Sequence, residues 1–147
     1  MLVKQMSVFV ENTTGRLAEL TRVLAKDGID IKASCIADTV DFGILRCIVD
    51  DPEEATRILK QNGFTASITE VIAVELEDRP GGFADVLEIL AKEKIGVDYI
   101  YSTIRSKEGA AVIVLKVEDP QKAIDILKKH DVKLYKMQDI SEMRHAK

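Results

Sequence analysis

Two short polar turns contain the residues of this sequence that are best suited to bind a small molecule. In each turn a polar residue, Asn12 or Asp78, precedes a glycine by three positions, and a segment with helical spacing follows. A helix that begins at such a glycine has unpaired backbone N–H groups, which attract a carboxylate. The glycine lets a ligand approach the backbone, and the side chain of Asn12 or Asp78 can accept from an ammonium group. The two turns read Asn12-Thr13-Thr14-Gly15-Arg16-Leu17 and Asp78-Arg79-Pro80-Gly81-Gly82-Phe83.

The same pattern also fits a purely structural role. As helix caps, Asn12 and Asp78 would each contribute about 1 kcal/mol to stability, and the glycines would serve the turn alone. Arg16 and Arg79 fit surface charges as well as ligand contacts. The turns by themselves therefore leave binding and capping open as interpretations.

The turns belong to an internal repeat that covers the whole chain. Gly15 matches Gly81 at an offset of 66 positions, and the apolar residues of the following segment match with it. Further along, Asp51-Pro52 matches Asp119-Pro120 at an offset of 68, so the intervening hairpin has gained two residues. A duplication of this kind indicates two copies of one structural unit. We expect two domains, residues 1–70 and 71–147.

Each copy has the periodicity of strands and helices in the order βαββαβ. Short β-branched runs predict strands, apolar residues at helical spacing predict a helix after each turn, and Pro52 and Pro120 suit the first turn of a second helix. Hairpin turns are expected at 41–43 and 107–109. The expected strands are 8–10, 29–36, 44–49 and 65–69 in the first copy and 71–76, 97–104, 110–117 and 132–136 in the second.

This order predicts an α+β fold of two ferredoxin-like units, each an antiparallel sheet with both helices on one face. The other face of the second sheet is expected to be apolar, with Val112 and Val114 joined by Ile100 and Ile104. Tyr99 and Tyr101 share the parity of Val97 and are expected under the helices. In the first copy the outer face is expected to be mixed, with Ile36, Ile44 and Ile48 alternating with Lys32, Ser34 and Arg46. An uncovered apolar sheet face predicts association with a second chain, as a homodimer or a larger homo-oligomer.

The two turns, the helices that follow and the element order resemble the ACT domain family. The stretch DRPGGFADVLEILAKEKIGV is similar to that family's D-R-P-G-x-L/F-x-x-h-x-x-h-L pattern, and the stretch LAELTRVLAKDGIDI is similar to the helix and strand that follow it. The resemblance extends from residue 3 to about residue 140. It implies an allosteric regulatory module that binds a free amino acid where two ACT units lie side by side, and that controls a partner metabolic enzyme. It implies no catalysis and no cofactor.

The resemblance assigns the family's binding residues to particular positions of this chain. The polar turn residue falls on Asn12 and Asp78, and the glycine on Gly15 and Gly81. A polar residue at the start of the second strand falls on Asp30, where the second copy has Gly96. The first copy also departs from the pattern, because Thr13-Thr14 replaces Arg-Pro. The two copies are therefore expected to form unequal sites. The expected contacts are the residues of both turns together with Asp30.

Composition argues against several other classes. The net charge is −4, with 8 Lys and Arg against 11 Asp and Glu in residues 1–70 and 13 against 14 in residues 71–147, so neither copy is basic enough to favour nucleic acid. No apolar stretch reaches the roughly 18–20 residues of a membrane span, and no secretory signal is evident. A cytoplasmic protein is expected. Cys35 and Cys47 lack a CxxC spacing and fit buried thiols, and no metal site is expected.

Three other βαββαβ classes lack their functional residues here. RNA-recognition modules carry stacking aromatics on the central strands, whereas 43–48 and 112–117 contain none. Acylphosphatases need an Asn on a second or third strand beside the Arg of the first turn, and heavy-metal domains need a CxxC. Nucleophilic catalysis needs a Ser or Cys with a His base, and His130 and His145 lie far from every repeated feature of the sequence, which disfavours it. A module that binds no ligand and only associates with partners remains open as the alternative.

Overall fold

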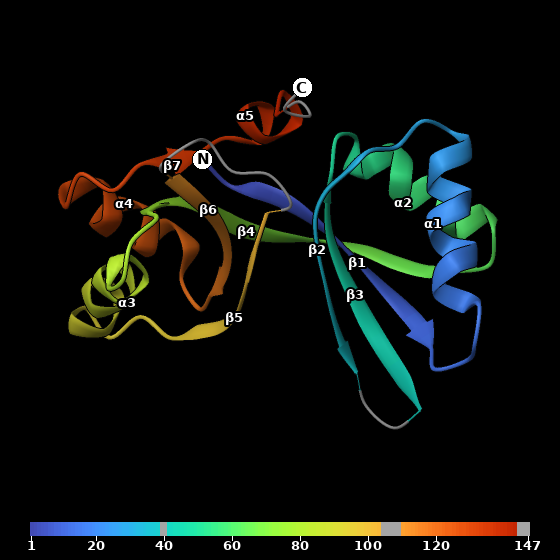
Figure 1. The fold of residues 1–147 in the computed structure, drawn as a ribbon, viewed down its shortest axis with the longest axis horizontal. Coiled ribbons are helices and arrows are strands. Elements are labelled where there is room, and N and C mark those ends of the chain that lie inside the picture. The colour runs from blue at the N-terminus through green and yellow to red at the C-terminus, as the bar shows by residue number, and fades with distance from the viewer. Residues whose placement is uncertain (39–40, 104–109, 144–147) are drawn as a thin grey trace. The chain divides into compact units, whose positions relative to one another are not determined.

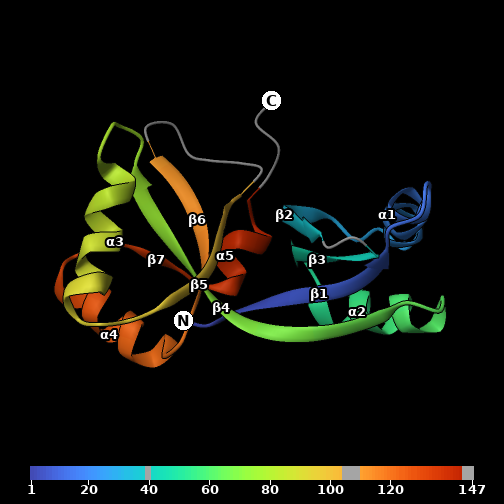
Figure 2. The same ribbon diagram turned by 90° about the horizontal axis from the view of Figure 1, so that it is seen from below.

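The computed structural model of the chain describes residues 1–38, 41–103 and 110–143 (Figures 1 and 2). The chain divides into two compact units, which we call the first unit (Lys4–Thr69) and the second unit (Met1–Val3 with Glu70–Lys147). The elements are β1 (Val3–Glu11), α1 (Arg16–Lys26), β2 (Ile31–Asp38), β3 (Phe42–Val49), α2 (Pro52–Gln61), β4 (Thr65–Glu77), α3 (Gly82–Lys92), β5 (Val97–Ser102), β6 (Ala110–Val117), α4 (Pro120–Lys129), β7 (Leu134–Tyr135) and α5 (Met137–Ser141).

The two units have the same strand order, which confirms the predicted fold class. In the first unit the order is β2-β3-β1-β4, and in the second it is β7-β4-β6-β5. The pairs β1–β3 and β2–β3 of the first unit, and β4–β6, β4–β7 and β5–β6 of the second, are antiparallel. Helices α1 and α2 cover one face of the first sheet, as α3 and α4 do in the second (Figure 1). Where two strands were expected at 65–69 and 71–76, the single strand β4 continues from one unit into the other.

The helices form where apolar residues recur on one side and where their ends are capped. Leu20 and Leu24 of α1 are fully buried in the first core, and Leu90 of α3 is fully buried in the second. Burying a leucine side chain contributes roughly 1.5–3 kcal/mol relative to exposure. Asp51 and Asp119 accept from the backbone N–H three residues on, at 3.0 and 3.1 Å, with proline at the first helical position in both helices.

A β-bulge in each second strand changes which residues face the helices. In β5 the register shifts between Val97 and Tyr99, so Val97 and Ile100 both pack on the helix-side core. The expectation that Ile100 joins the outer face was therefore wrong, as was the placement of Tyr99 and Tyr101 under the helices. Tyr101 pairs instead with the outer-face residue Val114. A bulge inserts one extra residue and so reverses the alternation beyond it.

The same irregularity in β2, between Ile31 and Ala33, sets the position of Ile36. Ile36 pairs with the core residue Leu45 and therefore lies on the helix side of the first sheet, contrary to its expected place on the outer face. It remains 46% exposed because it stands near the end of the strand. This displacement brings Ile36 beside the first polar turn, and it becomes important for the site.

The outer face of the second sheet is already covered by the chain itself. Val112 and Val114 are 1% and 0% exposed. Helix α5, which the sequence did not predict, lies on this side of the sheet, opposite α3 and α4 (Figure 2), and its Ile140 is fully buried. The expectation that Val112 and Val114 present a subunit contact was therefore wrong. Ile104 and the expected hairpin turn 107–109 lie outside the described residues.

Candidate functional site

The two polar turns have the same backbone structure. In both, a tight turn closes directly after the strand, the first helical N–H bonds back into the turn, and the glycine carbonyl accepts the first helical bond. In the first unit these bonds run from Thr13 N to Glu11 O (2.8 Å), Arg16 N to Thr13 O (3.1 Å) and Glu19 N to Gly15 O (3.0 Å). In the second they run from Arg79 N to Glu77 O (2.9 Å), Gly82 N to Arg79 O (3.1 Å) and Asp85 N to Gly81 O (3.0 Å).

The glycine of each turn is the N-cap of the helix that follows. Gly15 and Gly81 both have φ of 89° in the left-handed region, a conformation that costs side-chain-bearing residues energy and glycine almost none. Asn12 and Asp78 lie three residues earlier, so neither is the N-cap residue that the structural interpretation requires. The carboxylate of Asp78 is exposed and accepts no hydrogen bond from the described part of the chain.

Each helix start presents two backbone donors. Within residues 1–38, 41–103 and 110–143, the N–H groups of Leu17 and Ala18 have no acceptor, and neither do those of Phe83 and Ala84. These are the second and third helical residues, whose donors lack an intrahelical partner by geometry. Together with the helix dipole they favour an anionic group such as a carboxylate.

A cavity of about 160 Å³ opens beside the first turn. Of the predicted binding residues it includes Asn12, Thr13 and Leu17. Ile36 and Gly43 form its far wall, together with Val10 and Glu11. A Cβ at Gly43 would lie 3.3 Å from Ile36 Cγ1, so glycine at this position leaves room for the Ile36 side chain. Leu17 and Ile36 are 41% and 46% exposed at its rim. Sequence reasoning missed Ile36 and Gly43, because the β2 bulge that brings Ile36 here has no recognisable sequence pattern.

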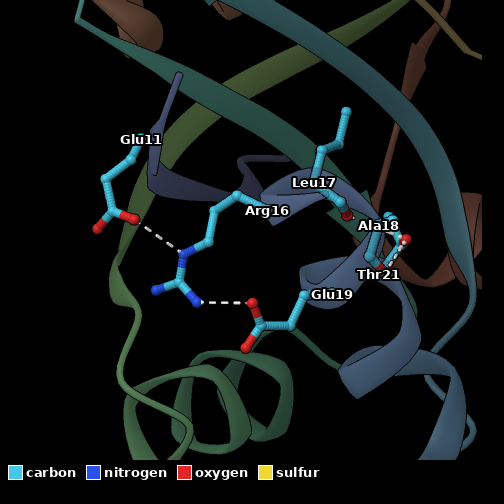
Figure 3. A network of polar contacts seen from close by, with 6 residues as sticks. All are labelled: Glu11, Arg16, Leu17, Ala18, Glu19 and Thr21. Atoms are coloured by element: carbon cyan, nitrogen blue, oxygen red, sulfur yellow. Dashed lines mark hydrogen bonds and ion pairs between the residues drawn. The ribbon is translucent and has the colours of Figure 1, made fainter. Parts of the chain in front are cut away.

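Arg16 belongs to the first turn in sequence but does not line this cavity. Its Nε donates to Glu11 Oε2 and its Nη1 to Glu19 Oε2, both at 3.0 Å (Figure 3). The guanidinium carbon lies 3.9 Å from the centroid of the Phe64 ring. The hydrogen bond to Glu19 raises the pKa of Arg16 above its ordinary value, which keeps the charge fixed. Thr14 and Gly15 are exposed on the turn.

Asp30 lies at the other end of α1 from Gly15. The helix between them has 11 residues, a length of about 16 Å. The Asp30 carboxylate pairs with Lys32 Nζ at 2.7 Å. Within the first unit Asp30 therefore does not meet the Asn12–Leu17 turn. A role for Asp30 remains a prediction for a site that combines two units, as the family resemblance implies.

The second turn has different surroundings. Arg79 binds the carboxylates of Glu77 and Asp85, the latter at 2.6 Å. Asp78, Pro80, Gly81 and Phe83 are exposed. Gly82 lines a cavity of about 370 Å³ on the side toward the α4–β7 connection, and the other predicted residues of this turn do not line that cavity. The counterpart of Ile36 is Ser102, because Ile36 pairs with Leu45 and Ser102 pairs with Ile113, the matching residue of the second unit.

Neither a metal-holding cluster of side chains nor a membrane-spanning helix is present in the described part of the chain. Among residues 1–38, 41–103 and 110–143, no group of three or more His, Cys, Asp and Glu side chains could hold a metal ion. In the same part of the chain, no helix is both long and apolar enough to span a bilayer.

Comparison with known proteins identifies relatives over nearly the full length. The family described as ACT domain pair matches residues 1–144. The crystal structure of protein BT0572 from Bacteroides thetaiotaomicron is 40% identical, covers 97% of this chain and 98% of its own, and superposes with a TM-score of 0.91. No curated protein matches the chain.

More distant structures share the fold alone. The ligand-free regulatory subunit of aspartate kinase from Thermus thermophilus is 16% identical with a TM-score of 0.63, covering 87% of this chain and 93% of its own. The same subunit from Thermus flavus is 16% identical with a TM-score of 0.59, covering 88% and 93%.

Proposed function

Because this chain belongs to the ACT domain pair family, we propose that it is a non-catalytic regulatory protein that binds a free amino acid at the Asn12–Leu17 turn. The observation that carries the proposal is the cavity at this turn, which lies beside two backbone donors without acceptors among the described residues. We propose further that it acts in the cytoplasm on a partner metabolic enzyme.

The groups around the cavity suit the three parts of an amino acid. The N–H groups of Leu17 and Ala18 suit the carboxylate. Asn12 and Glu11 offer side-chain oxygens for the ammonium group, and Val10, Ile36 and Gly43 surround the space left for a small side chain. A volume of about 160 Å³ favours a small amino acid over an aromatic one.

The exposed rim of the cavity supports a binding site that a second ACT unit completes. Leu17 and Ile36 would lose their exposed apolar surface against a neighbour, which favours a homo-oligomer, in the simplest case a dimer. Asp30 of the neighbouring unit is the residue that we expect to reach the ammonium. Two acidic side chains near one ammonium group, Glu11 and Asp30 of the neighbouring unit, would bind it strongly and would repel each other when the site is empty.

A thermal-shift screen with the common L-amino acids tests the proposal. A ligand of about ten heavy atoms reaches a dissociation constant between roughly 1 and 100 µM. At millimolar concentration it would raise the melting temperature by several degrees. Nucleotides and divalent metals serve as controls and should give no shift. If no amino acid shifts the melting temperature, the binding proposal fails.

The alternative is a module that associates with partners without binding a ligand. One observation favours it specifically. On the outer face of the first sheet, Phe9 is 45% exposed and stacks on Phe42 with ring centroids 4.2 Å apart. Phe9, supported by the half-buried Phe42, offers apolar surface on which a second protein could pack. A negative ligand screen together with a stable dimer in sedimentation would favour this alternative.

A further inference from the structure

The second unit contains a larger cavity that the proposed amino-acid site does not use. Its volume is about 370 Å³, and it lies between α3 and the connection from α4 to β7. Val86, Ile89 and Val132 provide apolar surface, while Glu77 and Asp85 provide carboxylates. Gly82, the first residue of α3, lines it, whereas the exposed turn residues Asp78 and Gly81 do not.

The equivalent place in the first unit is filled by an arginine side chain. At the offset of 66, Glu77 corresponds to Glu11, Gly82 to Arg16 and Asp85 to Glu19. The guanidinium of Arg16 bridges Glu11 and Glu19 at 3.0 Å (Figure 3) and lies 3.9 Å from the centroid of the Phe64 ring. In both copies an arginine bridges the two carboxylates, but in the first it is Arg16, which lies over the Phe64 ring, and in the second it is Arg79 of the turn.

Phe64 corresponds to Val132 at the offset of 68, and the backbone bears this out. Phe64 N donates to Leu59 O at 2.9 Å, and Val132 N donates to Leu127 O at 3.0 Å, so the hydrogen bonds match at the same offset. Replacement of Phe64 by Val132 and of Arg16 by Gly82 removes an aromatic ring and a long side chain. These two differences account for the open space in the second unit.

No side chain at position 82 can fill this space. A Cβ at Gly82 would lie 2.2 Å from the carbonyl oxygen of Glu77, so this position excludes any side chain unless the backbone shifts. Arg79 reaches Glu77 Oε2 and Asp85 Oδ2 from the turn, and its side chain is 50% exposed, against 20% for Arg16. Glu77 Oε1 and Asp85 Oδ1 have no donor among the described residues.

The charge around the cavity favours a cation. The lining includes four acidic side chains, Glu75, Glu77, Asp85 and Asp131. The basic side chains of the lining are His130 and Lys133, and Lys133 pairs with Glu75 at 3.3 Å; Arg79 reaches Asp85 from the turn. Carboxylates with unused oxygens beside apolar walls suit a planar cation with several N–H donors, because each carboxylate oxygen accepts more than one hydrogen bond.

We propose that this cavity binds a small molecule with a guanidinium group on an aliphatic stem. The guanidinium takes the place that Arg16 has in the first unit, donating to Glu77 and Asp85, and the stem packs against Val86, Ile89 and Val132. A primary ammonium fits less well, because it lacks the planar fork that Arg16 presents to its two carboxylates. The site does not depend on amino-acid binding at the first turn.

The first experiment titrates the full chain with agmatine and follows backbone amide signals. We expect saturable shifts at Gly82, Asp85 and Val132, with weaker shifts from butylamine. Asp85→Asn should weaken agmatine binding by about tenfold or more, because it removes a charged hydrogen-bond acceptor. Glu19→Gln, the matched change in the first unit, should leave the affinity unchanged. No shift at Gly82 with millimolar agmatine, or equal losses from both variants, would overturn the proposal.

Two further variants test whether the residue differences between the two units create the binding cavity. Val132→Phe restores the ring that fills the space in the first unit and should abolish binding. Arg16→Gly with Phe64→Val removes the internal guanidinium and should raise the calorimetric stoichiometry from one agmatine to two. Undiminished binding to a folded Val132→Phe variant would show that the ligand lies elsewhere. If the double variant does not fold, Asp85→Asn and Val132→Phe decide the question. Equal affinity for butylamine and agmatine would refute the guanidinium assignment.

Discussion

The first turn and the second turn have matching backbones, yet the space beside them differs. Three hydrogen bonds and the left-handed glycine are reproduced at an offset of 66 residues. Beside the first turn the arginine lies inward over Phe64, and a small cavity opens toward β2 and β3. Beside the second turn, the half-exposed Arg79 bridges Glu77 and Asp85, and a larger cavity opens toward the α4–β7 connection. The two copies thus share the backbone of the turn, while the side-chain differences at Arg16/Gly82 and Phe64/Val132 accompany the larger cavity of the second unit.

The outer sheet faces differ just as strongly, and the largest expected effect tests that difference. Val114 is fully buried, so Val114→Lys should destabilise the protein by several kcal/mol, because a charged amine loses its hydration there. Phe9→Lys, on the exposed face of the first sheet, should cost only about 1 kcal/mol from lost stacking on Phe42. Urea unfolding monitored by circular dichroism measures both. Similar losses would show that the two faces are equally covered.

The glycine turns offer the next largest effect. Gly15→Val and Gly81→Val should each destabilise the chain by about 1–3 kcal/mol, because a β-branched residue is strained at φ of 89°. Their effects on amino-acid binding should differ. Gly15→Val should abolish binding by blocking close approach to the backbone, whereas Gly81→Val should cost less affinity. Calorimetry on the folded variants measures this, and equal losses of affinity would mean that the two turns form equivalent sites.

Much of the fold followed from periodicity, and the exceptions have local causes. The order βαββαβ could be predicted because Leu20, Leu24 and Leu90 recur at helical spacing and because proline starts α2 and α4. The faces of β2 and β5 could not be predicted, because each bulge depends on a register shift between paired strands and has no sequence signature. Helix α5 is only five residues long, too short for its apolar residues to show a period.

The candidate site was predicted less completely than the fold. Asn12, Thr13 and Leu17 lie at one cavity as a local turn pattern indicates. Arg16 and Gly82 occupy equivalent positions, and their different roles depend on Phe64 and Val132, which lie far away in sequence. Contacts of that kind become visible only when the chain is folded. The repeat itself was the one sequence signal that could have directed attention to the Arg16/Gly82 difference.

The helix caps of the two copies should behave alike, and their removal should have a smaller effect on stability. Asp51 and Asp119 cap α2 and α4 with nearly equal hydrogen bonds of 3.0 and 3.1 Å. Asp51→Ala and Asp119→Ala should therefore each cost about 1 kcal/mol. Denaturant midpoints, with Asn at either position as the conservative control, measure the loss. A marked difference between the two alanine variants would reveal that one helix contributes more to the cooperative unfolding of the chain.

At neutral pH the smallest effect on stability belongs to Cys47, because its thiol is then protonated in both the folded and the unfolded state. This residue reports on the first unit alone. The chain has two cysteines, Cys35 and Cys47, and both lie in the first unit. Burial raises the pKa of the Cys47 thiol to about 12, so the neutral thiol is favoured in the fold. The folded state then holds this proton while an unfolded thiol has released it, and stability should fall as the pH rises from the thiol's ordinary range toward 12.

The same burial should protect Cys47 from alkylation in the native state. Iodoacetamide should modify half-buried Cys35 first, and Cys47 only when the first unit opens. Val114→Lys, a change in the second unit, then tests whether the units unfold together. If β4 couples them, this variant should accelerate alkylation of Cys47 along with the loss of overall structure. Unchanged protection of Cys47, read by mass spectrometry while the second unit unfolds, would show that the two copies are separate folding units despite the strand they share.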